Sequence, residues 1–235
     1  MPLRSFITPA LAGMLWLAVA CGSSSEPSNS GVIVEPITPT PQAASTPTAS
    51  PESLLKEFIL PIVGACLPQS DSLMPNAPRP YRNGTHEGID LYESDNCIRI
   101  RRGTEVVAAK AGSVVRADIV FSQLTLSELN QLQANPNTPE ALDRFRGRQV
   151  WIDHGNGIVT RYAHLQGIAP GIVVGKAVGA GQVVAYVGES GTPESVTAPG
   201  TDNHLHFEVR VGSSYAGQGL PASEVRRIYQ GVFKP

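Results

Sequence analysis

The sequence predicts an all-β fold of small, mainly antiparallel sheets that is interrupted by one helical insertion. Three observations lead to this expectation. From Gly84 onward, short runs rich in valine and other β-branched residues are separated by glycine-containing turns. The dipeptide Asn156-Gly157 lies between two such runs and is a strong signal for a hairpin. Residues 122–148 break the pattern and have the capping signals of helices.

Four stretches of the chain are expected to supply most of the strands. They are residues 103–121, with a turn at Ala111-Gly112; residues 148–165, with the turn HGNG; residues 171–191; and residues 203–211. Residues 52–62 could form either a short helix or the first strand. Residues 221–235 could form a helix that packs on the sheet.

The insertion is expected to contain two helices. Thr125 and Glu128 have the spacing of a capping box, which starts a helix. A second helix could begin at Thr138-Pro139 and stop at Gly147. The insertion could be surface decoration, or it could act as a lid or a substrate-selecting element.

The first 20 residues are expected to be an export signal. Arg4 is followed by an apolar run that ends in small residues at LAVAC. A cysteine after small residues resembles a bacterial lipoprotein signal, which implies that Cys21 is lipidated and anchors the protein to a membrane. Ala18 departs from the leucine that is commoner at its position. An ordinary secretory signal is the alternative, and either signal would take the protein out of the cytoplasm, with its domain on the extracytoplasmic side.

Residues 21–53 are expected to be a tether and residues 54–235 the folded domain. The tether is rich in serine, proline and threonine and has too few apolar residues to form a core. The chain has a formal net charge of -2 and no basic block, so a nucleic acid partner is not expected.

With Cys21 lipidated, Cys66 and Cys97 remain, and in an oxidising compartment this even number predicts one disulfide. A Cys–His metal site is the alternative, but there is no C-x-x-C spacing to support it.

Two histidines lie one residue apart in the last predicted strand, NHLHFEVRV. Because residues two apart on a strand share a face, His204 and His206 should project together with Glu208 and Arg210. The residues between them, Leu205, Phe207, Val209 and Val211, should form the apolar face. Paired imidazoles suit a transition metal or acid–base chemistry, although a solvated or hydrogen-bonded histidine pair is the simpler interpretation.

Two further motifs carry residues of the same kind. In THEGIDLY, His86 and Asp90 are four residues apart, so they would share a face in an extended segment, and Gly88 would let a metal or substrate approach the backbone. In TRYAHLQ, alternation would place His164 on the face of Tyr162. The fifth histidine, His154 in WIDHGNG, is expected to be a turn or surface residue without a chemical role.

Together, H-x-G-x-D, T-x-Y-A-H-L and H-L-H-F-E resemble the motifs of lysostaphin-like, LytM-type zinc metallopeptidases, which cut peptide bonds in bacterial cell walls. The resemblance extends from about Leu60 to Val211. It implies a fold of the LytM, duplicated-hybrid-motif type that binds one zinc ion and acts on peptidoglycan peptides. It also implies zinc ligands at His86, Asp90 and His206 and catalytic histidines at His164 and His204. Three protein ligands would leave the fourth tetrahedral position open for water.

The resemblance leaves several questions open. It does not assign the roles of base and oxyanion stabiliser between His164 and His204, and it identifies no cell-wall or division regulator as a partner. The link VTAPGTD, residues 196–202, is longer than usual in the family, so this link and the insertion are expected to shape substrate choice. One alternative is a catalytically silent or occluded domain that binds the cell wall and regulates other wall hydrolases. Another is a carrier module modified at Lys110.

Overall fold

A computed structural model describes residues 55–233 of the 235-residue chain. The signal and tether predicted for residues 1–53, with Cys21, lie outside the described residues, so the domain boundaries stay predictions. Within the described part, the strands are β1 (Pro78–Arg79), β2 (Gly84–Thr85), β3 (Ile89–Leu91), β4 (Glu105–Val107), β5 (Gly112–Ala117), β6 (Val150–Asp153), β7 (Ile158–Ala163), β8 (Gly167–Ile168), β9 (Ala177–Val178), β10 (Val183–Tyr186), β11 (Leu205–Val211) and β12 (Ser214–Tyr215). The helices are α2 (Leu126–Ala134), α3 (Pro139–Arg146), α4 (Glu194–Thr197) and α5 (Ala222–Val232), with 3-10 turns at Asp71–Leu73, Pro80–Arg82 and Glu93–Asp95.

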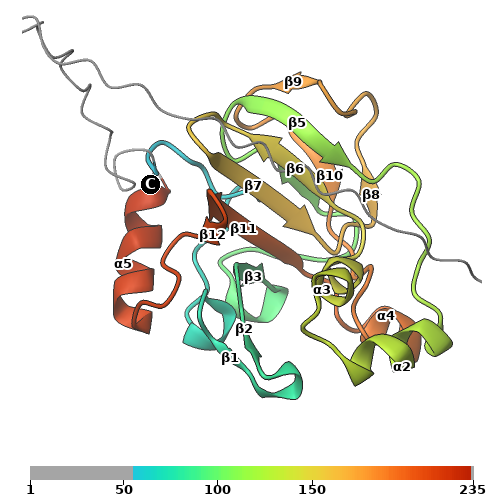
Figure 1. The fold of residues 1–235 in the computed structure, drawn as a ribbon. Helices are drawn as coiled ribbons and strands as arrows, with labels where there is room; N and C mark the ends of the chain where they lie inside the picture. Colours follow the sequence, from blue (N-terminus) through green and yellow to red (C-terminus); the bar gives the residue numbers. More distant parts are fainter. Residues whose placement is uncertain (1–54, 234–235) are drawn as a thin grey trace, which may run out of the picture. The chain divides into compact units, whose positions relative to one another are not determined.

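The strands form one large and two small antiparallel sheets, which confirms the predicted fold class. The large sheet has the order β12-β11-β7-β6-β5-β9, and β3 also pairs with β11. A second sheet has the order β4-β10-β8, and β1 pairs with β2 in a short hairpin. Figure 1 shows the second sheet behind the large one, with α5 at one side of the molecule and α2, α3 and α4 at the other. None of the helices within residues 55–233 has the length and apolar character needed to span a bilayer.

The core follows the alternation that the sequence predicts for β11. Leu205, Phe207 and Val209 are fully buried and pack in the main apolar cluster. In the β6–β7 hairpin, positive φ angles at Asn156 and Gly157 form the turn, as the Asn-Gly signal predicts.

The helical insertion forms as predicted. Thr125 caps α2 through a complete capping box with Glu128. Thr138 caps α3, which ends before Gly147. The two helices lie beside α4 at one end of the large sheet (Figure 1).

Two other expectations have different outcomes. The disulfide between Cys66 and Cys97 is present, and α5 forms within the predicted C-terminal stretch. In contrast, residues 55–62 form neither a helix nor a regular strand. Glu57 has a positive φ of 69°, which interrupts either structure, and Phe58 makes only an isolated parallel bridge with Phe233.

Gly88 has a different structural role from the one that the sequence predicts. Its neighbour β3 pairs with β11, and a Cβ atom at Gly88 would collide with the carbonyl group of Phe207 on β11. The glycine therefore lets two backbones approach each other rather than admitting a metal or substrate. This close approach brings Asp90 and His206 together.

Candidate metal centre

Three of the predicted site residues meet where β3 pairs with β11. The register places Asp90 directly opposite His206, and His86 enters from the segment between β2 and β3. Asp90 Oδ1 lies 2.8 Å from His206 Nδ1 and 2.9 Å from His86 Nε2. The two ring nitrogens are 3.0 Å apart. All three residues are buried, and their facing atoms could hold one metal ion.

The outer nitrogen of each predicted ligand histidine has a hydrogen-bond partner. Nδ1 of His86 lies 3.1 Å from the carbonyl oxygen of Met74, which can only accept, so Nε2 carries the lone pair. Nε2 of His206 lies 3.1 Å from Oε1 of the buried carboxylate Glu208 and donates to it. These outer hydrogen bonds orient both rings toward Asp90, as the hydrogen-bond partners of metal-binding histidines do.

The charges in this cluster favour a cation. Burial alone would raise the pKa of Asp90, but the neighbouring His86 and His206 hold it well below its ordinary value. Burial lowers the pKa of His86. Burial would also lower the pKa of His206, but hydrogen bonds to Asp90 and Glu208 raise it to about 9. With this pKa His206 Nδ1 would carry a proton at neutral pH, and a metal ion that bound this nitrogen would release it.

The spacing of the three atoms also fits zinc. Ligand atoms about 2.0–2.1 Å from a tetrahedral zinc ion lie roughly 3.3 Å from one another. The observed separations of 2.8 to 3.0 Å would have to widen by only a few tenths of an ångström. Two imidazoles and one carboxylate are a donor set suited to a catalytic zinc site with an open position.

The two predicted catalytic histidines lie beside this cluster. Nδ1 of His164 donates to the carbonyl oxygen of Ser190 at 3.0 Å, and Nδ1 of His204 donates to that of Asp202 at 2.8 Å. In the neutral form of each ring, Nε2 therefore carries the lone pair. Their ring centroids are 4.6 Å apart, and that of His164 is 5.7 Å from that of His206. The structure thus brings all five predicted residues together.

The route by which His164 reaches the site was not predicted. Tyr162 packs on Phe207 in the core, so simple alternation would have placed His164 on the core side. Instead β7 ends at Ala163, and His164 has a φ of 60°, which turns its side chain toward His204 and His206. Burial, followed by repulsion from His204 and His206, holds the pKa of His164 well below its ordinary value.

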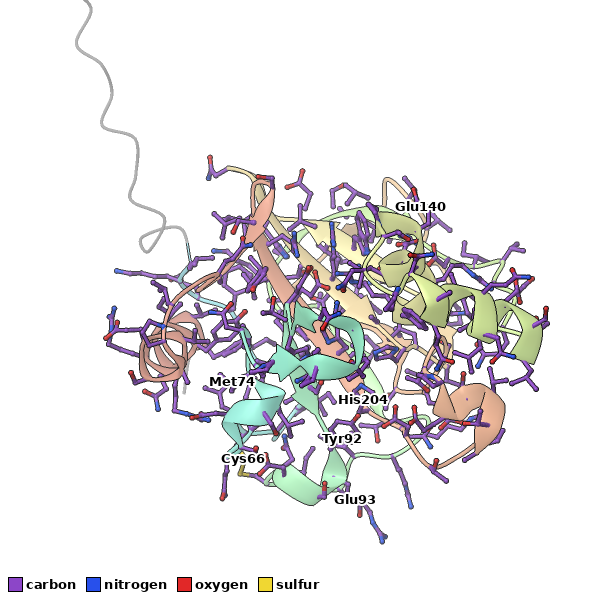
Figure 2. All side chains as sticks on the ribbon, turned by 60° about the horizontal axis from the view of Figure 1, so that its bottom comes forward. Cys66, Met74, Tyr92, Glu93, Glu140 and His204 are labelled. Carbon is purple, nitrogen blue, oxygen red and sulfur yellow. A yellow bond between two sulfur atoms is a disulfide. The ribbon has the colours of Figure 1, made fainter. Side chains whose placement is uncertain are left out.

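Other residues contact the predicted ones and carry no role in the sequence prediction. Tyr92 stacks on His204, with centroids 4.2 Å apart and planes inclined by 17° (Figure 2). Its hydroxyl donates to Asp202 Oδ1 at 2.8 Å. Arg79 NH2 donates to Asp90 Oδ2 at 3.2 Å. Strand alternation could have identified two of these contacts, because Tyr92 comes two residues after Asp90 and Glu208 comes two residues after His206. No sequence pattern around Arg79 indicates its contact with Asp90.

The cluster lies in an open groove of about 790 Å³. The insertion supplies one part of its wall. The 3-10 turn Asp71–Leu73 and the β1–β2 hairpin supply another. The α4 region supplies a third. The lining includes Leu73, Pro78, Arg79, Tyr81, Arg82, Tyr92, Gln133, Pro136, Leu142, Phe145, Thr192, Pro193, Glu194 and Asp202. The groove therefore has room for a peptide segment.

Two residues considered from the sequence lie outside the site. His154 is half-buried rather than on the surface: Nδ1 bonds the carbonyl oxygen of Ala111 at 2.9 Å and Nε2 lies 2.8 Å from Thr160 Oγ1. Lys110 is held by the carbonyl oxygen of Lys56 and lies over the ring of Phe58. Neither residue lines the groove.

Comparisons with known proteins place the sequence in a family context. The family model described as Peptidase family M23 matches residues 84–218, which is more than half of the chain. A search of curated proteins finds no significant match. Among solved structures, a zinc containing peptidase from Vibrio cholerae is 23% identical, with a TM-score of 0.44; the match covers 71% of this chain and 41% of that chain.

Two further solved structures are similar at a comparable level. The catalytic domain of lysostaphin from Staphylococcus simulans is 19% identical with a TM-score of 0.40, and the match covers 74% of this chain and 97% of that one. A mutated catalytic domain of the prophage-encoded M23 protein EnpA from Enterococcus faecalis is 23% identical with a TM-score of 0.42, covering 67% and 92%.

Proposed function

Because the chain belongs to peptidase family M23, we propose that it is a zinc metalloendopeptidase that hydrolyses peptide bonds in peptidoglycan stem or cross-bridge peptides. Members of this family are mostly zinc-dependent metallopeptidases. One observation carries the proposal: the ligand atoms of His86, Asp90 and His206 converge, with two further imidazoles, in an open groove. These three residues would hold one zinc ion per chain.

When bound, zinc would polarise the scissile carbonyl and lower the pKa of a water molecule toward ~7. The histidines of the chain would handle the protons. His164 is suited to accept the proton of the attacking water, because Ser190 binds its Nδ1–H and leaves Nε2 as the atom that can accept. It would then donate this proton to the leaving amine. His204, when protonated, would donate a hydrogen bond to the developing oxyanion.

Substrate choice is assigned to the walls of the groove. Leu142 and Phe145 from α3 line one side, and Pro193 and Glu194 from the α4 region line another. We expect Phe145→Ala to change the relative rates of cleavage of walls with different cross-bridges, while leaving zinc content unchanged. Equal rate ratios for the variant and the wild type would contradict this assignment.

The main experiment combines metal analysis with an activity assay. The full chain is purified, its zinc is quantified, and it is incubated with peptidoglycan sacculi with and without a chelator. Release of new peptide ends that requires one zinc per chain supports the proposal, and His206→Ala is the negative control. Release that continues in the presence of the chelator would contradict it.

A second candidate function is an occluded domain that regulates other wall hydrolases. It is favoured by the contact between the α2–α3 turn and the β1–β2 hairpin, where Asn137 and Arg82 hydrogen-bond each other. This contact borders the groove, since Arg82 and Pro136 line it. One bound zinc without cleavage of sacculi, and cleavage restored by Asn137→Ala, would select this alternative.

We also propose that the protein is exported and anchored by lipid at Cys21, with its domain facing peptidoglycan. The support is the sequence of residues 1–21, which resembles a lipoprotein signal. Labelling with a fatty-acid analogue tests this: the wild type should incorporate the label and Cys21→Ser should not. Unlabelled wild-type protein in the culture medium would indicate an ordinary secretory signal.

A further inference from the structure

One arginine of the insertion lines the groove and also binds carboxylates beside the candidate metal centre. Arg146 ends α3, and its side chain is only 14% exposed. Its Nε donates to Glu208 Oε1 at 2.6 Å, and NH2 donates to Glu87 Oε2 at 2.7 Å. The guanidinium therefore spans two carboxylates from different segments of the chain.

Glu208 connects this arginine to a predicted zinc ligand. Its side chain is fully buried, and Oε1 accepts from both Arg146 and His206 Nε2. The other oxygen faces Arg161 at 3.3 Å and Arg210 at 3.1 Å. A buried carboxylate requires such cations, because an unpaired charge is costly away from water. Arg146 is the arginine that binds the same oxygen as His206.

The main chain of Arg146 supports a second site residue. Its carbonyl oxygen accepts from the backbone N–H of His164 at 2.9 Å. The next residue, Gly147, lies so close to Ser190 that a side chain there would collide with the Ser190 carbonyl, which holds His164 Nδ1. Arg146 therefore holds the backbone of His164 as well as the carboxylate that contacts His206.

The helix that carries Arg146 is itself fixed on the polar face of the sheet. Asp143, one turn earlier on α3, forms a two-pronged ion pair with Arg116 of β5, at 2.5 and 3.0 Å. Gln149 also donates to Asp143 at 3.0 Å. This docking gives Arg146 a defined position from which to hold Glu208.

We propose that Arg146 is a positioning residue: through Glu208 it orients His206 for metal binding, so that the insertion supports the metal centre as well as lining the groove. This inference rests on the proposed zinc-binding function. Removal of the guanidinium should leave Glu208 free to turn away from His206. Zinc affinity should then fall, although Arg146 is not a ligand.

The test compares three variants of the full chain. Arg146→Met removes the charge and keeps an apolar side chain. Arg146→Lys keeps the charge, but a compact ammonium cannot bridge Glu208 and Glu87 in the same way. Arg144→Met is the matched control, because Arg144 lies on the same helix and pairs with Glu128 at 3.3 Å, away from the site. The zinc dissociation constant is measured by competition with a chelator, and kcat and KM are measured at saturating zinc.

We expect Arg146→Met to weaken zinc binding about tenfold, the lower end of the range for residues that support metal ligands. Arg146→Lys should give a smaller loss, and Arg144→Met none, with KM unchanged in all three. Unchanged zinc affinity with a raised KM would make Arg146 a substrate contact and overturn the inference. Equal losses in Arg146→Met and Arg144→Met would also overturn it, because helix docking would then be the cause.

The result can be separated from the proposed function itself. If the wild type binds no zinc, the proposed function fails before any variant is compared. If Arg146→Met does not fold, as judged by circular dichroism, Arg146→Lys carries the test, and wild-type zinc affinity in that variant overturns the inference.

Discussion

Variants of Tyr92 can separate the support of a predicted catalytic histidine from metal binding. Its ring stacks on His204 at 4.2 Å, and its hydroxyl holds Asp202, whose carbonyl oxygen binds His204 Nδ1. Tyr92→Phe removes only the hydroxyl, whereas Tyr92→Leu also removes the stacked ring. None of these groups is a predicted zinc ligand, so zinc content should stay constant in both variants.

The two variants should lower the free energy of unfolding by different amounts. A hydrogen bond to a charged group contributes about 1.5–3 kcal/mol, and the lower end applies because the side chain of Asp202 is 21% exposed. For Tyr92→Phe we therefore expect a loss of about 1.5 kcal/mol in the free energy of unfolding and a Tm lower by about 3–6 °C. Tyr92→Leu should lose about 1 kcal/mol more, because the aromatic pair is also gone.

Activity should separate them further. With the ring in place, kcat of Tyr92→Phe should fall by less than about threefold, whereas a displaced imidazole in Tyr92→Leu should reduce kcat by up to about 100-fold. Thermal unfolding gives the stability, and release of peptide ends from sacculi at saturating zinc gives kcat. Equal kcat values for the two variants would refute the role assigned to the stacked ring.

Three further predictions concern the ligands, the disulfide and pH. His206→Ala should lose zinc and activity together. His204→Ala should keep its zinc, and its kcat should fall by about 10²–10⁴-fold. Wild-type activity in His204→Ala would contradict the assignment of His206 as a ligand and His204 as a catalytic residue. Replacing Cys66 and Cys97, 31 residues apart, by serine should lower the free energy of unfolding by about 3–4 kcal/mol in urea denaturation, and an unchanged midpoint would exclude this contribution. Burial lowers the pKa of His154 below 6.5, so the unfolded state binds the proton more readily and stability falls as pH drops below 6.5. His154→Asn should reduce this dependence by at most about 1.4 kcal/mol per pH unit, the limit for one proton, and an identical slope would show that His154 does not contribute.

The sequence predicted those parts of the site that follow from strand alternation. On β11, the period of two residues places His206 and Glu208 on one face and Phe207 on the other, as observed. The capping box at Thr125 and the hairpin at Asn156 were also predictable, because each is a local preference of a few neighbouring residues.

Other parts depend on how distant segments pack, and no local pattern specifies them. His164 reaches the site only because the chain leaves the strand with a positive φ, and its backbone is held by Arg146, 18 residues earlier. The segment RFRGR contains three arginines, and nothing in its sequence tells which one binds Glu208. That choice follows from where α3 ends against β11. Motifs thus identify the candidate ligands and candidate catalytic groups, whereas the residues that orient these groups are determined by tertiary contacts. In this chain, one of those contacts comes from the insertion.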